Sequence, residues 1–444
     1  MNERYIAAIE VSSSKIVAAI GKTKGSGALD VVAVEYESTP EGCVRYGIIQ
    51  NLEETSMVVS KLFARLEQRP NIQPRKIKSV IVGLGGRSLK NITKEVSMSL
   101  PEDSEITDDI LARLQDQALH SAIDNTLEVV DAVPRVFKVG NSQTSSPKGM
   151  IGNHISGIFD LIVCRPELKR NIRRTITDKL HLDVDGFVVT AMATGHLILS
   201  PEEKRLGCML VDMGAETTTV TIYQKGALHY YATLPMGGRN ISRDIASLGV
   251  VDAKAEEIKI TSGNALVETN IPNLVINGLK LAEITNHVVA RSEEMVANII
   301  AQIEYAGISD SDLQGGIICI GGGFRLKGLM ECLEMESNLQ VRRGTLPEYV
   351  RVEDPHTNGV EVAEVASVLY AGATLSSKES LYTPERAPIP TNGVLPFANE
   401  ELNQPQRNEK PEKPKGNSFF SKMGRTVASL FSGSDDDDTE LLDE

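Results

Sequence analysis

The sequence of 444 residues lacks several features that identify common protein classes. It has no apolar run approaching about 18 residues and no GxxxxGK or GxGxxG motif, which argues against a membrane-spanning helix and against the common phosphate-binding loops. Its five cysteines form no CxxC pair, which is typical of a reducing compartment and argues against disulfides or a structural zinc site. The net charge of −14 has the wrong sign for sequence-independent nucleic-acid binding, so no nucleic-acid partner is expected.

Enzyme motifs are also scarce. The seven histidines show no HExxH spacing, and no GxSxG nucleophile motif occurs. The first residues, MNERYIAAIEV, carry an acid before a short apolar run and lack a small-residue cleavage site, so they predict a first strand rather than a signal peptide.

Residues 1 to about 380 alternate short apolar runs with helical patterns, which indicates an α/β protein. Strands are expected in YIAAIEV, SVIVGLGG, GIFDLIV, CMLVDMG and GGIICIGGG. Helices are expected in MVVSKLFARLEQ, ITDDILARLQDQALHSAI and EITNHVVARSEEMVANIIAQIEYAGI. The periodicity stops beyond Thr383, and residues 384–416 hold seven of the 19 prolines, so they are predicted to be a disordered linker.

An amphipathic helix is predicted after this linker, in residues 417–433. Its apolar stripe and the two cations beside it comprise Phe419, Phe420, Met423, Val427, Leu430 and Phe431 with Lys422 and Arg425. Packing on the chain's own globular part or on a partner is one interpretation. The long linker and the cations favour a helix lying in the plane of a membrane surface. Residues 434–444 form an acidic tail.

Two stretches about two hundred residues apart share one pattern. IAAIEVSSSKIVAAIG and CMLVDMGAETTTVTIYQKG each contain a strand that ends near an acid (Glu10, Asp212), a polar turn and a second strand. Such turns present backbone N–H groups to phosphates, and the two acids could hold a magnesium ion beside them. The turn residues are Ser12, Ser13, Ser14 and Lys15 in the first hairpin and Gly214, Thr217 and Thr218 in the second.

Two glycine turns extend the pattern. Gly237 and Gly238 precede a helix expected near Asn240, and Gly321, Gly322 and Gly323 follow a buried strand. Glycines allow a ligand to approach the backbone closely, and a helix start attracts anions. Either turn alone is a weak signal.

The order of these motifs resembles the nucleotide site of the actin/Hsp70/sugar-kinase superfamily. Within it the chain resembles the FtsA family of bacterial actin-like cell-division proteins, through SPEEKRLGCMLVDMGAETTTVTIY, PMGGRNISRDIA, AEEIKI, GGGFRLKGL and EVASVLYAGATL. The resemblance implies a two-lobed actin-like (ribonuclease H-like) α/β fold. Its parts would be a first lobe in 1–82 and 167–206, an inserted subdomain in 83–166, a second lobe in 207–240 and 313–383, and a helical subdomain in 241–312.

The resemblance also implies ATP and Mg²⁺ as ligands. Glu10 and Asp212 match the acids of the family's hairpins, the polar and glycine turns match nucleotide contacts, and Glu256 and Lys259 match residues near the ribose and adenine. Arg291 matches a basic position that binds the C-terminal peptide of FtsZ. Lipid of the cytoplasmic membrane, other copies of the chain and further division proteins are the other implied partners, at the cytoplasmic face of the membrane at the division site.

Several residues depart from the family pattern. Ser12 replaces a glycine, Ala215 and Glu216 replace a glycine pair, Thr219 replaces a frequent aspartate, and Thr190 replaces a glutamate that orients water or magnesium. Glu216 would repel phosphates unless magnesium or Lys15 lay between them. We therefore expect slow or absent ATP hydrolysis. A small-molecule kinase of the superfamily and a PilM-like pilus-assembly protein are the alternatives.

Overall fold

The computed structural model describes residues 3–24, 27–266, 271–354, 357 and 362–384. These residues belong to the first of two units into which the chain divides, Met1–Glu385. The predicted linker from residue 385 onward, the amphipathic helix at 417–433 and the acidic tail lie outside the described residues. None of the described helices combines the length and hydropathy that a bilayer crossing requires.

The first lobe is built on a six-stranded sheet with the order β12-β7-β1-β2-β3-β20. β12, β7 and β1 run parallel, and β1, β2 and β3 form an antiparallel meander. The strands are β1 (Arg4–Val11), β2 (Lys15–Thr23), β3 (Leu29–Ser38), β7 (Ser79–Leu84), β12 (Asp183–Val189) and β20 (Val350–Val352). The predicted strands YIAAIEV and SVIVGLGG are therefore confirmed, with β7 ending before its two glycines.

The second lobe repeats this arrangement. Its sheet has the order β15-β14-β13-β18-β19, in which β19, β18 and β13 run parallel and β13, β14 and β15 form the meander. The strands are β13 (Cys208–Met213), β14 (Thr218–Gln224), β15 (Ala227–Leu234), β18 (Ile317–Ile320) and β19 (Val341–Arg343). The two hairpins recognised in the sequence thus occupy equivalent places in two equivalent sheets.

The second sheet divides its side chains between two cores. Leu210, Ile318 and Ile320 belong to the core of the first lobe, whereas Val211 and Cys319 belong to that of the second. This follows from the period of two in a strand, which sends successive side chains to opposite faces. Because the strands are buried on both faces, their sequences read as continuous apolar runs.

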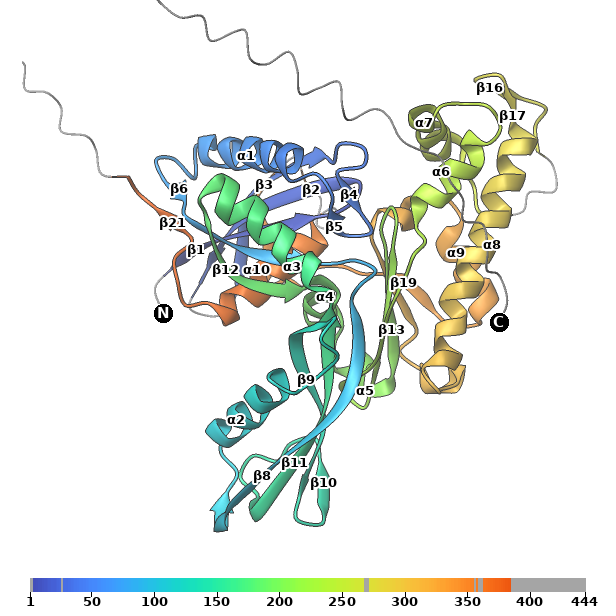
Figure 1. The fold of residues 1–444 in the computed structure, drawn as a ribbon. Helices are drawn as coiled ribbons and strands as arrows, with labels where there is room; N and C mark the ends of the chain where they lie inside the picture. Colours follow the sequence, from blue (N-terminus) through green and yellow to red (C-terminus); the bar gives the residue numbers. More distant parts are fainter. Residues whose placement is uncertain (1–2, 25–26, 267–270, 355–356, 358–361, 385–444) are drawn as a thin grey trace, which may run out of the picture. The chain divides into compact units, whose positions relative to one another are not determined.

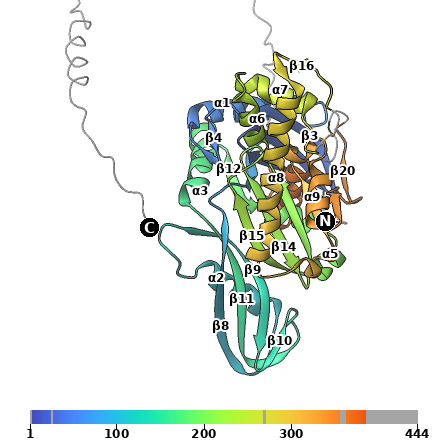
Figure 2. The ribbon, with the colours of Figure 1, turned by 90° about the vertical axis from the view of Figure 1, so that its right-hand side faces the viewer.

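Helices cover both sheets (Figure 1). Those of the first lobe are α1 (Leu52–Gln68), α3 (Pro166–Arg173) with the π-helical turn Arg174–Asp178, α4 (Thr190–Ile198), α5 (Pro201–Leu206) and α10 (Ala363–Leu375). Those of the second lobe are α6 (Gly238–Ala246), α7 (Asp252–Ser262), α8 (Leu281–Tyr305) and α9 (Leu329–Ser337), with 3₁₀ turns at Asp310–Asp312 and Gly322–Arg325. Figure 2 shows α8 running along the strands of the second sheet. The three glycines after β18 lead into the 3₁₀ turn, and α9 begins six residues after Gly323.

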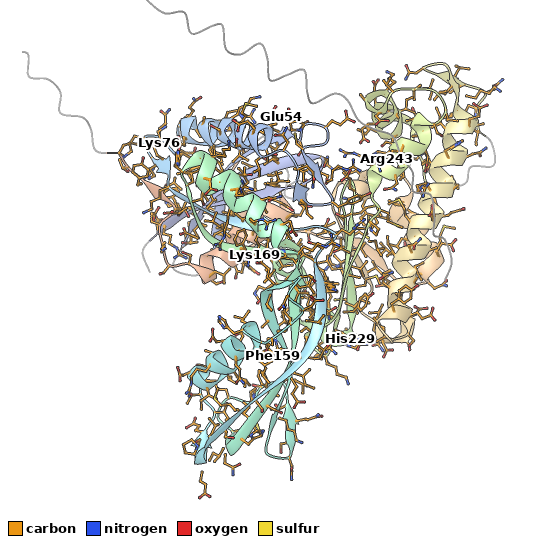
Figure 3. All side chains as sticks on the ribbon, viewed as in Figure 1. Glu54, Lys76, Phe159, Lys169, His229 and Arg243 are labelled. Carbon is orange, nitrogen blue, oxygen red and sulfur yellow. The ribbon has the colours of Figure 1, made fainter. Side chains whose placement is uncertain are left out.

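A separate subdomain lies between β7 and α3. Its sheet has the order β10-β9-β11-β8, formed by β8 (Lys90–Glu105), β9 (Glu128–Val139), β10 (Ser142–Thr144) and β11 (Ile151–Cys164), with α2 (Asp108–Leu119) packed on it. Phe137 and Phe159 meet edge to face inside its own core; Figure 3 labels Phe159. Arg135 is bound by the buried Asp160 at 2.7 and 2.9 Å and donates to the His229 carbonyl of β15 at 3.0 Å, so this subdomain is joined to the second lobe.

Three short two-stranded pairings complete the fold. β4 (Val44–Arg45) pairs with β5 (Ile48–Ile49), β6 (Lys76–Ile77) with β21 (Leu381–Tyr382), and β16 (Val275–Ile276) with β17 (Leu279–Lys280). The first of these places the loop at Arg45 and Tyr46 beside the second lobe, because the Tyr46 N–H donates to Glu216 at 2.8 Å.

Candidate nucleotide site

Glu10 and Asp212 occupy matching places at the ends of the first strands of the two sheets. Glu10 is paired with Gly83 of the parallel strand β7, and Asp212 is paired with Ile320 of the parallel strand β18. The Asp212 carboxylate contributes to the raised pKa of Glu10 although 202 positions separate the two residues in the sequence. The duplicated folding pattern therefore places both predicted magnesium ligands in one region between the lobes.

Both acids have raised pKa values. Burial is the largest cause, and the Glu364 carboxylate at the start of α10 is the next, while the Lys15 ammonium opposes the shift. Two buried carboxylates thus lie within electrostatic reach of a third carboxylate, Glu364, and of the Lys15 ammonium. The motif EVASVLYAGATL begins with Glu364, but the sequence did not assign this carboxylate to the site; the start of α10 brings it there.

The first predicted phosphate turn is held by the chain itself. The N–H and hydroxyl of Ser12 both donate to the Lys15 carbonyl, at 3.1 and 2.7 Å. Thr39 fixes the outer side of the turn by donating to the Ser12 and Ser14 carbonyls, at 2.7 and 3.0 Å. Ser14 is exposed, and Ser13 is buried against the second lobe.

The second predicted turn packs against Gly237 and Gly238. The Gly238 N–H donates to the Gly214 carbonyl at 3.0 Å, and a Cβ on Gly237 would lie 2.6 Å from that same oxygen. Gly237 is therefore required for backbone packing. Within the turn, the Thr217 carbonyl accepts from the Gly214 N–H at 2.9 Å.

Thr218 differs from its expected role as a nucleotide contact. Its side chain is fully buried, and its hydroxyl donates to the Met236 carbonyl at 2.9 Å. The hydroxyl is thus already used inside the second lobe.

The three glycines after β18 have different surroundings. A Cβ on Gly321 would lie 2.6 Å from Asp212 Oδ1, and one on Gly323 would lie 2.4 Å from Met213 Cγ. Gly321 also has a φ of +88°, which glycine tolerates best. A Cβ on Gly322 would meet nothing within 4 Å. Close packing explains why positions 321 and 323 are glycine, whereas the exposed backbone of Gly322 is open to a ligand.

Glu256 and Lys259, expected near the ribose and adenine, lie together on α7. Lys259 Nζ binds Glu256 at 2.8 Å and the Gly238 carbonyl at 3.0 Å, and the Ser242 hydroxyl also donates to Glu256. A Cβ on Gly238 would lie 3.8 Å from the Cα of Gly323. The structure therefore brings α7, the start of α6 and the glycine turn after β18 to one place.

Glu216 has partners that the sequence did not indicate. Its buried carboxylate lies 3.1 Å from Arg45 Nε, 3.0 Å from Arg239 Nη1 and 3.6 Å from Arg243 Nη2. Burial alone would raise its pKa, but bonds from the Tyr46 N–H and the Ser13 hydroxyl and the charges of Arg239 and Arg45 lower it. The expectation that magnesium or Lys15 must offset this charge is wrong, because three arginines offset it.

Thr190 begins α4 and is buried, with 2% of its surface exposed. Its hydroxyl finds no hydrogen-bond partner among the described residues. A Cβ on Gly83 would lie 2.8 Å from Thr190 Oγ1 and 3.7 Å from Glu10 Cβ, so Thr190 lies close to the first acid. The departure from glutamate therefore falls beside the candidate magnesium ligands.

These surroundings fit a nucleotide with magnesium. The described residues contain no group of three or more His, Cys, Asp or Glu side chains arranged to hold a metal. Magnesium, however, usually takes only one or two protein carboxylates and completes its shell with water and substrate phosphates. Glu10 and Asp212 supply that donor chemistry, while Gly322 and Lys259 remain predicted contacts of the nucleoside.

Arg291, the expected docking residue on α8, is already paired within the second lobe. Its guanidinium binds Asp244 of α6 at 2.5 and 3.1 Å and also binds Glu294. Only 28% of its side chain is exposed. An acidic peptide would therefore compete with Asp244 and Glu294 for this side chain.

Two family models match this chain. The model described as cell division protein FtsA matches residues 209–369, and the model described as SHS2 domain inserted in FTSA matches residues 86–163. The second match covers most of the separate sheet β10-β9-β11-β8. Together the two models cover more than half of the chain.

Individual relatives and structures agree with these models. The cell division protein FtsA of Porphyromonas gingivalis is 28% identical over 345 residues, which cover 75% of this chain and 71% of the relative. That of Pseudomonas aeruginosa is 24% identical over 408 residues, covering 87% and 95%. Among solved structures, the PilM-PilN type IV pilus biogenesis complex matches with a TM-score of 0.58 and 16% identity, over 83% of this chain and 98% of that one. This likeness concerns the fold alone.

Proposed function

This chain belongs to the FtsA family of actin-like cell division proteins, and from this membership we propose that it binds ATP with magnesium, assembles into polymers and tethers the FtsZ ring to the cytoplasmic membrane. It would thereby also help to recruit further division proteins. The observation that carries the proposal is the family's inserted subdomain, residues 86–163, within an actin-like body.

The nucleotide part rests on the site between the lobes. Glu10 and Asp212 would hold the magnesium ion through its waters, Lys15 would neutralise phosphate charge, and Glu256 and Lys259 would contact the nucleoside. Hydrolysis would be slow, because Thr190 lacks the carboxylate that would position an attacking water.

The membrane part rests on sequence. Residues 417–433 place six large apolar side chains on one helical stripe beside Lys422 and Arg425. Burying these six could contribute on the order of 10 kcal/mol before ordering costs, and cations near anionic lipid add to it. The preceding linker would span about 30 Å as a flexible chain, which lets the helix act at a distance from the folded body.

The FtsZ part rests on the family resemblance of Arg291. The acidic C-terminal peptide of FtsZ would dock on the 241–312 subdomain and take over the guanidinium from Asp244 or Glu294. This exchange costs little, since all three partners are partly exposed and exposed ion pairs are weak.

A reconstitution with three components tests the whole proposal. FtsZ of the same organism is mixed with liposomes, with and without this protein, and the pellet is analysed. We expect FtsZ to pellet only when the full chain is present, and not with a chain ending at residue 384. Equal FtsZ in all pellets would refute tethering. The PilM-like alternative shares only the fold, and a small-molecule kinase would need neither the inserted subdomain nor the terminal helix.

A further inference from the structure

Three arginines from both lobes surround one glutamate at the junction of the two predicted phosphate turns. Arg45 comes from the β4–β5 hairpin of the first lobe, while Arg239 and Arg243 come from α6 of the second (Figure 3 labels Arg243). The glutamate, Glu216, comes from the turn between β13 and β14, and its side chain is 1% exposed. We call Arg45, Arg239 and Arg243 the arginine cluster.

The carboxylate of Glu216 accepts hydrogen bonds from the kinds of donor that bind a phosphate oxygen. It accepts from the Tyr46 N–H at 2.8 Å and from Arg239 at 3.0 Å, and it also accepts from the Ser13 hydroxyl. Ser13 belongs to the turn predicted to hold phosphate in the first lobe. Donors of both lobes therefore converge on this one side chain.

The charges around Glu216 do not balance. Each member of the arginine cluster has Glu216 as its only ion-pair partner among the residues that the structure describes. Arg87 adds a further cation nearby, since it stacks on Tyr46 with 5.1 Å between guanidinium and ring. One carboxylate pairs with all three arginines, and the Glu256 charge also acts on Arg239, so the cluster keeps a net positive charge, which is the arrangement that attracts a polyanion.

We propose that the arginine cluster is an anion site for the phosphates of a nucleotide, and that Glu216 occupies it as an internal ligand. Glu216 then holds the two lobes together without nucleotide, because it bridges Arg45 and Tyr46 of one lobe with Arg239 and Arg243 of the other. A triphosphate binds the arginine cluster after displacing the carboxylate of Glu216. This inference rests on the proposed nucleotide binding, and it assigns Arg45, Arg239, Arg243 and Glu216 to that site.

Substituting Glu216→Gln tests the inference, because glutamine keeps the shape and removes the charge. Binding of Mg·ATP and of inorganic tripolyphosphate to the full chain is measured by calorimetry. We expect both to bind at least tenfold more tightly to Glu216→Gln than to the wild type. The matched control is Glu202→Gln, which removes one charge from an exposed glutamate paired with Arg205 on α5 and should change neither affinity.

Hydrogen exchange gives a second readout that does not depend on nucleotide. Without ligand, the Tyr46 amide should exchange faster in Glu216→Gln, since the amide oxygen is a weaker acceptor, and tripolyphosphate should restore the protection. If Glu216→Gln folds poorly, Arg45→Gln serves instead, because its side chain is 44% exposed and Glu216 keeps two arginines. That variant should bind tripolyphosphate several-fold more weakly than the wild type.

The outcomes separate this inference from the proposed function. If the wild type and Glu216→Gln bind Mg·ATP equally, the internal-ligand role is wrong while nucleotide binding stands. If tripolyphosphate binds tightly to Glu216→Gln but ATP binds to neither protein, the anion site stands and the nucleotide assignment fails. Equal Tyr46 exchange in both proteins would refute the bridge between the lobes.

Discussion

Asp212 lies against Gly321 so closely that a Cβ on Gly321 would sit 2.6 Å from Asp212 Oδ1. Asp212 is the second-last residue of β13 and Gly321 directly follows the parallel neighbour β18, at a sheet edge where ligands commonly bind. The glycine thus leaves room for the carboxylate of Asp212, one of the two proposed magnesium ligands.

Changing Asp212 to Asn should abolish magnesium-dependent nucleotide binding, because an amide cannot replace the anionic oxygen. Binding of a fluorescent ATP analogue, with magnesium and with EDTA, measures this. The melting temperature should stay within a few degrees, since asparagine has the same shape. Unchanged magnesium-dependent binding would contradict the assignment of Asp212.

ATP turnover should be slow in the wild type, because Thr190 cannot orient water as a carboxylate does. Single-turnover phosphate release should proceed below about 1 s⁻¹, the low end of ordinary enzymes. A faster rate would show that another group positions the attacking water.

Glu216 should stabilise the fold in a pH-dependent manner. Burial raises its pKa, but hydrogen bonds from the Tyr46 N–H and the Ser13 hydroxyl and the charges of Arg239 and Arg45 lower it overall. Arg243 also faces the carboxylate at 3.6 Å. A carboxyl group whose folded-state pKa is lowered stabilises the fold fully at pH values above its ordinary pKa of 4.5. This stabilisation is lost as the pH falls through the folded-state pKa. Glu216→Gln should therefore melt several degrees lower at pH 7, and the difference should shrink below about pH 4.5. Circular dichroism melts of both proteins between pH 4 and 7.5 measure it. A difference that is constant with pH would exclude a charge effect.

Replacing Arg291 with Glu should weaken binding of the FtsZ C-terminal peptide more than tenfold, that is by over about 1.4 kcal/mol. The control is Asp244→Asn, which removes the charge of one of the two intramolecular partners of the guanidinium and should bind the peptide at least as well as the wild type. Fluorescence anisotropy with a labelled peptide measures both variants. An unchanged dissociation constant for Arg291→Glu would move the docking surface elsewhere.

Replacing Phe420 and Leu430 with Asp should release the protein from liposomes, because two charges then lie on the apolar stripe of the terminal helix. Raising the salt concentration should weaken wild-type binding to anionic vesicles only in part, since the apolar contribution is not screened. Polymer formation should strengthen binding through avidity. Co-sedimentation is the measurement, and the melting temperature of the folded body is the control. If both proteins pellet equally, the helix has another role, such as docking on a partner.

Local sequence determined much of the architecture. Short apolar runs defined β1, β7, β13 and β18, because strands buried on both faces are mostly apolar; Glu10 and Asp212 near the strand ends are the exceptions. The repeated pattern around Glu10 and Asp212 predicted two equivalent lobes, and the strand orders confirm them. Periods of three and four residues located α1, α2 and α8 to within a few residues, since their apolar faces pack on the cores.

The tertiary structure alone decided how the charged side chains are used. Glu364, Arg45 and Arg243 follow no local spacing rule, and they approach Glu10, Asp212 and Glu216 only because separate strands and helices end at the same junction between the lobes. The sequence set the charge of Glu216 but not its environment, so repulsion of phosphate was the natural expectation. Electrostatic energy depends on distance in space and on exclusion of water, and both quantities are fixed only when residues 45, 216, 239 and 243 are folded together.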